Sequence, residues 1–238
     1  MALDFILKGE TEHPRNVIVL LHGSGQNARD MEPAAEIFAR ENPDALLIIP
    51  NGPRALPNCN GFDWFNPDDL QTTAGQLAFN MKPMLDELDL LIDSQLQKHG
   101  LTDKDLALFG FSLGGMTALY AGQHRENRCA AVVCHSSVYP VAVPPRTRPS
   151  TIMVMGDSNI RSIDEDIRKG DYPANFSYRS AIARLQDQDI DVAEYVVPGL
   201  THMTTADSLR ISAGIINDSL HGGRAFQTAV LPKYNLSF

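Results

Sequence analysis

The sequence predicts an α/β fold in which a mainly parallel central sheet carries helices on both faces. Short runs of Val, Ile and Leu recur along the chain, as is typical of strands buried on both faces. Amphipathic stretches with helical spacing separate these runs, and this alternation is what parallel strands require. Since no linker, repeat or low-complexity tract interrupts the pattern, we expect a single domain over residues 1–238, with an irregular tail from about 223 to 238.

The apolar runs and the turn residues that flank them mark the expected elements. Strands are expected at 3–7, 17–21, 46–49, 106–111, 130–134, 151–155 and 192–197. Helices are expected at 30–40, 72–98, from 116 onward, 176–186 and 204–221. Within the longest of these helices Pro83 predicts a kink or a later start, because proline has no N–H to donate and its ring crowds the preceding turn.

Composition and charge exclude several classes of protein. The 238 residues are 43% hydrophobic and 21% charged, which is ordinary for a globular protein. A net charge of −9 argues against nucleic-acid and anionic-membrane binders, because both need clustered Lys and Arg. Apolar runs of about five or six residues are too short to span a bilayer, so no stable membrane insertion is expected. Three cysteines without framework spacing, and a start without a signal-peptide pattern, predict reduced thiols in the cytoplasm.

One motif carries the chemistry. Gly110-Phe111-Ser112-Leu113-Gly114 fits G-x-S-x-G, and it follows an expected strand and opens an expected helix. In such a turn the serine hydroxyl is held out at the edge of the sheet, and the next backbone N–H faces a developing oxyanion. Ser112 is therefore the expected nucleophile and the amide of Leu113 an expected oxyanion donor. The alternative is a glycine-rich turn that happens to carry an ordinary serine.

A serine hydroxyl needs a base to act as a nucleophile near neutral pH. His202 is the best candidate, because it lies in a glycine-containing loop after the last expected strand and far down the chain from Ser112. The alternative is an ordinary surface histidine. A second oxyanion donor is expected from an early loop, where the amide of Ser24 in His22-Gly23-Ser24 is suitably placed. His22 itself is expected to bond within that loop rather than to act in catalysis.

Six segments together resemble the phospholipase/carboxylesterase family of α/β hydrolases, which includes acyl-protein thioesterases and small bacterial carboxylesterases. They are Leu20-Leu21-His22-Gly23-Ser24-Gly25, Pro50-Asn51-Gly52-Pro53, Gly61-Phe62-Asp63-Trp64-Phe65, Gly110-Phe111-Ser112-Leu113-Gly114-Gly115, Gly156-Asp157-Ser158-Asn159 and Pro198-Gly199-Leu200-Thr201-His202. The segments follow the family's order over almost the whole chain. The resemblance implies an α/β-hydrolase fold, and hydrolysis of esters or thioesters with no metal and no organic cofactor.

The acid of the triad is where this sequence departs from the family. The family places its aspartate fourth in a G-x-x-D turn, and that position here is Asn159. Three alternatives remain open: Asn159 orients the histidine as an amide, Asp157 or a residue of 162–166 supplies a carboxylate, or the triad is broken. The charged stretch 161–173 also lengthens the gap to His202, either as an insertion beside the active-site mouth or as a solvated surface loop.

Aromatic residues in a long early loop are the expected substrate contacts. Trp64 and Phe65 follow the second buried strand, and we expect a mixed role in which part of each ring faces the site as an apolar wall for an acyl or aryl group. The alternative is that Trp64 packs under the loop as a small satellite core. The apolar tail at 231–238 is a further candidate surface, for docking on the body or on a second copy, so a homodimer stays open.

The sequence thus predicts a serine hydrolase that cleaves small-molecule esters or thioesters of small to medium acyl groups through an acyl-enzyme. The first alternative is a catalytically weakened or inactive binding protein of the same fold, which Asn159 favours. A second alternative is an enzyme similar to dienelactone hydrolases. A cysteine in the G-x-S-x-G turn would favour that reading, and Ser112 disfavours it.

Overall fold

Parallel strands dominate the central sheet, as the apolar runs predicted. The computed structural model describes residues 3–222, and within them a seven-stranded sheet has the order β1-β3-β2-β6-β7-β8-β9. All neighbouring pairs are parallel except β1 with β3. Its strands are β1 (Phe5–Gly9), β2 (Asn16–Leu21), β3 (Ala45–Pro50), β6 (Leu106–Phe111), β7 (Ala131–His135), β8 (Thr151–Gly156) and β9 (Val192–Val197). These confirm every strand that was expected from the sequence.

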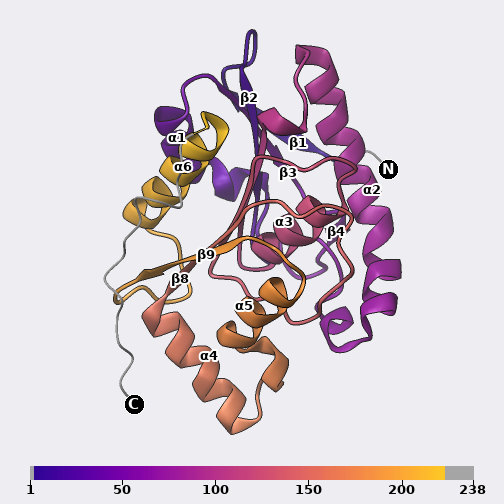
Figure 1. The fold of residues 1–238 in the computed structure, drawn as a ribbon, viewed down its shortest axis with the longest axis vertical. Helices are drawn as coiled ribbons and strands as arrows, with labels where there is room; N and C mark the ends of the chain where they lie inside the picture. Colours follow the sequence, from indigo (N-terminus) through magenta and orange to yellow (C-terminus); the bar gives the residue numbers. More distant parts are fainter. Residues whose placement is uncertain (1–2, 223–238) are drawn as a thin grey trace.

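Helices cover both faces of this sheet (Figure 1). They are α1 (Glu32–Glu41), α2 (Ala74–His99), α3 (Leu113–His124), α4 (Asp157–Lys169), α5 (Tyr178–Asp187) and α6 (Ala206–Leu220). A small two-stranded sheet of β4 (Arg54–Ala55) and β5 (Phe62–Asp63) was not expected. The fold is that of the α/β hydrolases, with a mainly parallel sheet between two helical layers. No helix within residues 3–222 has the length and apolar character needed to cross a membrane.

Strand β2 shows how the sheet builds two cores. Its side chains alternate between the faces, as the period of a strand requires. Val17, Val19 and Leu21 enter the cluster formed with α2, α3 and α5, whereas Ile18 and Leu20 enter the cluster formed with α1 and α6. All five are fully buried, and each such side chain stabilises the fold by about 1.5–3 kcal/mol relative to an exposed position.

Local signals in the sequence set the ends of the longest helix. The hydroxyl of Thr73 accepts from the amide of Gln76, and Gly100 ends α2 in the left-handed region at φ 68°. Only glycine adopts that conformation without steric cost, so the helix stops where the sequence predicted. Pro83 lies inside α2, and the helix starts upstream of it, so the later start that proline allowed is not seen.

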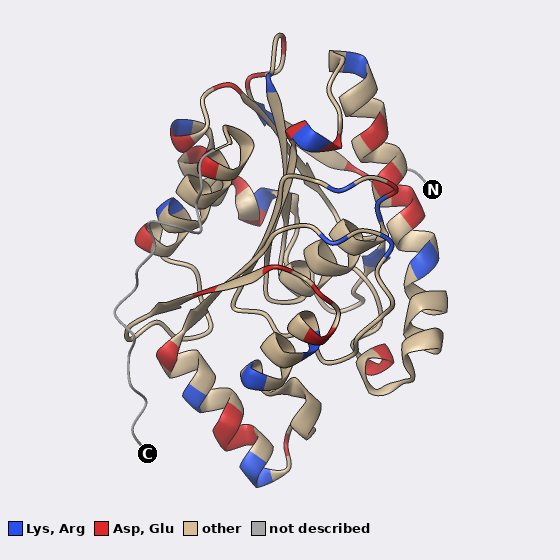
Figure 2. Ribbon diagram, in the orientation of Figure 1, with Lys and Arg blue, Asp and Glu red and all other residues tan. Residues whose placement is uncertain are grey.

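Of the two alternatives for the charged stretch 161–173, the solvated surface loop was wrong, because most of the stretch is helix α4. Ile160 and Ile163 recur at helical spacing and pack against the core of the α2–α3–α5 face. Arg161 pairs with Asp157 and Lys169 with Glu165 on the outer side. Figure 2 shows these charges alternating along α4 while the central strands are almost free of charge. Alternating charge at this spacing supports a helix.

Because the strands are parallel, their carboxyl ends meet at one edge of the sheet. The segments that leave this edge are 22–27 after β2, residue 112 after β6, 136–137 after β7, 157–159 after β8 and 198–202 after β9. Register fixes their relative heights, with Phe111 opposite His135 and Gly156 opposite Val197. Ser24, Ser112, Asp157, Asn159 and His202 therefore lie at this edge, whereas the candidate stretch 162–166 lies further along α4. The expected tail interactions of 231–238 fall outside the described residues.

Glycines let the Ser112 turn lie against its neighbours. A Cβ on Gly110 would lie 2.0 Å from the carbonyl oxygen of Gly114, and one on Gly114 would lie 2.3 Å from that of Leu21. Real Cβ atoms do not approach backbone this closely, so β6, α3 and the end of β2 meet only because these positions lack side chains.

We expect Gly110→Ala to lower the free energy of unfolding by about 1–3 kcal/mol, because the new methyl group must displace the backbone of the turn. The matched control is Gly214→Ala in α6, where an added Cβ meets nothing within 4 Å. That change is expected to raise stability by roughly 0.5–1 kcal/mol through helix propensity. Urea unfolding followed by circular dichroism measures both, and an unchanged midpoint for Gly110→Ala would contradict the packing argument.

Candidate active site

Ser112 occupies a strained turn between β6 and α3. Its φ is 54° and its ψ is −120°, a conformation that costs a non-glycine residue about 1–3 kcal/mol. Strand β7 and the turn after it hold this conformation in place. The Ser112 amide donates to the carbonyl of His135 at 2.9 Å, and the hydroxyl of Ser137 donates to the carbonyl of Ser112 at 2.8 Å. The half-buried Ser112 side chain therefore projects from the edge of the sheet.

The imidazole of His202 meets this serine. Its Nε2 lies 2.9 Å from Oγ of Ser112, although 90 residues separate the two along the chain. The Phe111 ring packs against the imidazole with centroids 5.3 Å apart. His202 is exposed on its outer side, while its inner side is covered, and this partial burial lowers the pKa of the imidazole below 6.5. The ring is therefore neutral, and able to accept a proton, at neutral pH.

Asn159 lies on the other side of the same ring. Its Nδ2 is 3.2 Å from Nδ1 of His202 and 3.2 Å from Sδ of Met155. The residue is 3% exposed and stands in the first turn of α4, directly after β8. Of the alternatives left open by the sequence for the acid position, the structure places Asn159 against the histidine. Ser112, His202 and Asn159 thus form a serine–histidine–amide row.

Asp157 takes a different place, on the loop that carries the histidine. Its Oδ1 accepts from the amide of Gly199 at 2.7 Å, and its Oδ2 pairs with Arg161 at 3.1 Å. Burial acts to raise the pKa of Asp157, but the Gly199 amide and the Arg161 guanidinium outweigh it and lower the pKa. The carboxylate therefore stays ionised and fastens the 198–202 loop to the start of α4. No hydrogen bond or ion pair within residues 3–222 joins this carboxylate to His202.

The loop after β2 offers a free amide beside the serine turn. The amide of Gly23 donates to the side chain of Gln26. The amide of Gly25 donates to the carbonyl of Phe62, and that of Gln26 donates to the carbonyl of Gly23. Within residues 3–222 no hydrogen bond takes the amide of Ser24, nor that of Leu113 at the start of α3. A Cβ on Gly23 would lie 3.0 Å from the Phe111 ring, so the loop rests on the turn. Two unpaired amides at this edge suit an oxyanion.

Buried polar contacts hold this loop in shape. His22 is fully buried, its Nε2 accepts from the amide of Gly52 at 3.0 Å, and its Nδ1 contacts the carbonyl of Gly23 at 2.8 Å. Burial lowers the pKa of His22, so the ring stays neutral. The hydroxyl of Ser24 donates to Asp63 at 2.6 Å, and Asp63 pairs with Arg54 at 3.3 Å. Both contacts fix the backbone around Ser24 rather than offering further reactive groups.

Trp64 and Phe65 do not form the open apolar wall that was expected. They are 1% and 5% exposed and belong to the core on the α2–α3–α5 face. The indole N–H of Trp64 donates to the carbonyl of His22 at 2.8 Å, and its ring packs on the His22 imidazole. They are not a small satellite core either, because they are part of the main core on that face. Burial of a large ring with a satisfied N–H stabilises the loop more than exposure would.

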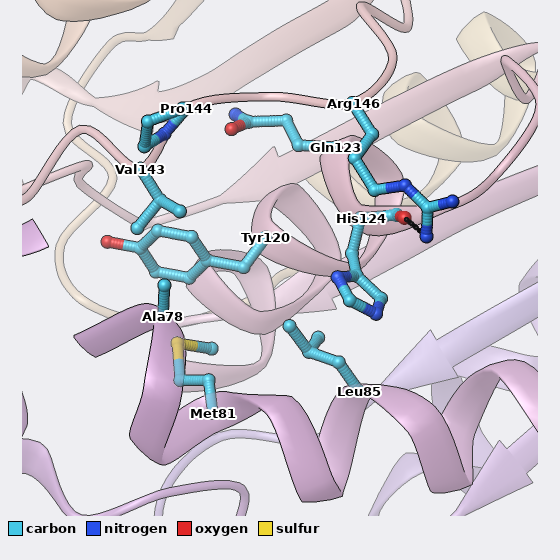
Figure 3. A pocket seen from close by; sticks show the side chains of 9 residues that line it. All are labelled: Ala78, Met81, Leu85, Tyr120, Gln123, His124, Val143, Pro144 and Arg146. Atoms are coloured by element: carbon cyan, nitrogen blue, oxygen red, sulfur yellow. Dashed lines mark hydrogen bonds between the residues drawn. The ribbon is translucent and has the colours of Figure 1, made fainter. Parts of the chain in front are cut away.

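A hollow away from the serine does not belong to this site. It has a volume of about 50 Å³ and lies between α2, the end of α3 and the loop that contains Val143 and Arg146. Figure 3 shows the Tyr120 ring above Met81, with His124 beside Leu85. Its lining contains neither Ser112 nor His202, since it opens at the opposite end of α3.

Within residues 3–222 no group of three or more His, Cys, Asp or Glu side chains is arranged to hold a metal ion. Cys129 and Cys134 are buried, and burial raises the pKa of both thiols, that of Cys129 to about 12. A thiol that stays protonated is a poor nucleophile.

Sequence reasoning overlooked two residues that shape the site. Phe111 packs on His202, and its position immediately before the motif serine is the signal that was available. Ser137 braces the serine turn, and a Cβ on Gly115 would lie 1.9 Å from its Oγ. Nothing local in the sequence pointed to Ser137, because the turn that it braces is 25 residues earlier in the chain.

A serine on a strand-to-helix turn, facing a histidine beyond the last strand, defines the site type of the α/β hydrolases. Comparison with known proteins names the group more closely. The sequence profile of the family described as phospholipase/carboxylesterase matches residues 3–155, more than half of the chain. The chain therefore belongs to the phospholipase/carboxylesterase family. The matched part contains Ser24 and Ser112 and ends before Asn159 and His202, so those two residues are located by the structure.

Individual relatives agree with this assignment. Acyl-protein thioesterase 1 homolog 2 of Dictyostelium discoideum is 24% identical over 150 residues, which cover 60% of this chain and 67% of that protein. The crystal structure of esterase PE8 covers 92% of this chain and 99% of its own with a TM-score of 0.74 at 22% identity. A carboxylesterase from Mesorhizobium loti covers 93% of this chain and 96% of its own, with a TM-score of 0.68 and 18% identity. The two structures show a shared fold.

The contacts of Asp157 yield a test of its role. Asp157→Asn keeps an oxygen that accepts from Gly199, so ester turnover is expected to stay within about threefold of the wild type. Asp157→Ala removes that acceptor and frees the histidine loop, and kcat is expected to fall about 10–100-fold, as small misplacements of catalytic groups do. Steady-state kinetics on an activated ester measures both. Loss of turnover in Asp157→Asn, with Asn159→Ala still active, would identify Asp157 as the acid instead.

Proposed function

We propose that this protein is a serine hydrolase that cleaves carboxylic esters or thioesters of small to medium acyl groups through an acyl-enzyme. The observation that carries the proposal is the 2.9 Å separation of Ser112 Oγ and His202 Nε2 beside two unpaired amides. Nucleophile, base and oxyanion donors within reach of one point are the parts that acyl transfer needs. Membership of an esterase and thioesterase family supports the same reaction class.

The reaction has two halves, acylation of Ser112 and hydrolysis of the acyl-enzyme. Ser112 Oγ attacks the acyl carbon while its proton passes to Nε2 of His202, and the amides of Ser24 and Leu113 donate to the oxyanion. The leaving group then departs, the proton on His202 passes to it or to solvent, and the acyl group stays on Ser112. In the second half, water gives a proton to His202 and attacks the acyl carbon. The same two amides stabilise the second oxyanion, and His202 returns the proton to Ser112 Oγ as the carboxylic acid leaves.

Asn159 decides which ring nitrogen of His202 is free to accept a proton. With Nδ2 toward the ring, as observed, the Nδ1 atom accepts and Nε2 carries the hydrogen. Rotation of the carboxamide by 180° presents Oδ1, which accepts from Nδ1–H and leaves Nε2 free for the serine proton. We propose that this second orientation is the catalytic one, as in cysteine–histidine–asparagine sites.

The second candidate function is a binding protein with the same fold and little or no turnover. The observation that favours it is the contact just described, because a histidine that is locked with its hydrogen on Nε2 is no base for Ser112. A carboxylate would exclude that tautomer, whereas an amide permits it.

The two functions separate on one experiment. The wild-type protein is expected to react covalently with a fluorophosphonate probe and to hydrolyse p-nitrophenyl esters, because both need an activated serine. Ser112→Ala is expected to do neither, and Ser94→Ala serves as a control, because it removes a hydroxyl whose only hydrogen bond within residues 3–222 is to the Leu91 carbonyl in α2. Intact-protein mass spectrometry reads the labelling. A wild-type protein that neither labels nor turns over esters is a binding protein.

The lowered pKa of His202 predicts how kcat/KM depends on pH. Partial burial lowers its pKa, so the base form persists to lower pH, and the acidic limb of kcat/KM is expected below pH 6.5. Asn159→Asp places a negative charge beside the imidazole, which favours the protonated ring and moves that limb upward. Initial rates across pH 4–8 measure the shift. If the acidic limb of kcat/KM does not move in Asn159→Asp, residue 159 does not affect the pKa of the His202 imidazole.

A further inference from the structure

The neighbour that His202 meets at Nδ1 carries no charge. Asn159 fills this position at 3.2 Å, and it is buried between the ring and Met155. Asp157, two residues earlier, is engaged by Gly199 and Arg161. Within residues 3–222 the ion pairs that involve a histidine are those of His124, on the far end of α3. A protonated His202 would therefore have no carboxylate partner.

The lack of a carboxylate beside His202 raises the free energy of each transition state in proportion to the positive charge on the imidazole. In a serine–histidine–aspartate site the carboxylate stabilises the imidazolium that forms as the ring takes the serine proton. A carboxamide orients the ring but supplies no opposite charge, so the imidazolium is less stable here. Transition states with a fully protonated ring lose more than those in which proton transfer has only begun.

Leaving groups differ in how much protonated histidine they need. A thiol has a pKa of about 8.5 and a phenol about 10, so thiolates and phenolates leave without receiving a proton. An aliphatic alcohol is about as weak an acid as water, near 16, and its alkoxide must be protonated as it leaves. Loss of an alcohol therefore proceeds only from an adduct in which His202 is fully protonated, and this step limits the rate.

We propose that Asn159 makes this site selective for acyl donors with acidic leaving groups, thioesters and aryl esters, and slow toward esters of aliphatic alcohols. The selectivity rests on the proposed hydrolase function and concerns the leaving group rather than the acyl chain. With a thioester, the bond from Ser112 Oγ to the acyl carbon forms, the carbon–sulfur bond breaks, and the thiolate carries off the electron pair. Attack is then the slow step, with the serine proton only partly on His202, and solvent removes the proton after the thiolate has left. With an alkyl ester, the adduct persists with His202 fully protonated until the same proton passes to the departing oxygen.

A series of acetates with one acyl group and different leaving groups tests the selectivity. The series is p-nitrophenyl, phenyl, trifluoroethyl and ethyl acetate, and kcat/KM is plotted against the acidity of the leaving group for wild type and Asn159→Asp. Asn159→Asp is expected to gain less than about 10-fold on p-nitrophenyl acetate and about 100-fold or more on ethyl acetate, the range of a general-acid contribution. An equal gain on all four substrates overturns the proposal.

A second measurement needs no variant and covers the case in which Asn159→Asp fails to fold. The wild-type ratio of kcat/KM for S-ethyl thioacetate over ethyl acetate is compared with the ratio of their rates with hydroxide, which reacts without acid catalysis. The enzyme ratio is expected to exceed the hydroxide ratio by about 100-fold or more. Matching ratios overturn the proposal.

These outcomes are distinct from a failure of the hydrolase function itself. If the wild type turns over p-nitrophenyl acetate and Ser112→Ala does not, the hydrolase function stands, whatever the dependence of kcat/KM on the acidity of the leaving group. If neither protein turns over any acetate of the series, the hydrolase function fails, and the selectivity falls with it. Asn159→Ala is the matched control, since it lacks both the charge and the amide, and its slope is expected to be at least as steep as that of the wild type.

Discussion

The left-handed backbone at Ser112 is the constraint on which the candidate site depends. A non-glycine residue holds φ 54° only when its surroundings leave no alternative, and here β7 accepts its amide while Ser137 binds its carbonyl. The glycines at 110 and 114 let β6 and α3 approach closely enough for this turn to form. With the turn in place, the hydroxyl, the Leu113 amide and the loop after β2 share one small region at the sheet edge.

The histidine side of the site is held by weaker and more distributed contacts. His202 belongs to a loop that is tied to the start of α4 by Asp157 and by the hydrogen bond from the Asn159 amide to the Leu200 carbonyl. Gly156 allows that close approach, because a Cβ there would lie 1.9 Å from the oxygen of Leu200. The same short turn thus positions both the ring and its neutral neighbour. The carboxylate of Asp157 lies in the same turn, but it accepts from the loop backbone rather than contacting the imidazole.

Most of the fold was accessible from local patterns, since buried parallel strands read as apolar runs and the ends of α2 carry a threonine cap and a glycine. Helix α4 was missed because its charges obscure the two isoleucines that face the core. Trp64 and Phe65 were expected to face the site, and this was wrong because local sequence does not show which side chains become buried. Composition shows that Trp64 is apolar, but only the packed structure shows that its indole N–H finds the carbonyl of His22 and that its ring is covered.

The sequence by itself determined the sheet, the motif serine at 112, the loop histidine at 202 and the absence of an aspartate at 159, because each is written in a short stretch of residues. Tertiary structure alone decided that Asn159, and not Asp157, lies against the ring. Residues 157 and 159 differ by two positions in one turn, and their side chains point in different directions once that turn becomes the first turn of a helix. Which of them meets His202 depends on how β8 and β9 pair and on where the 198–202 loop crosses α4, and neither is encoded locally.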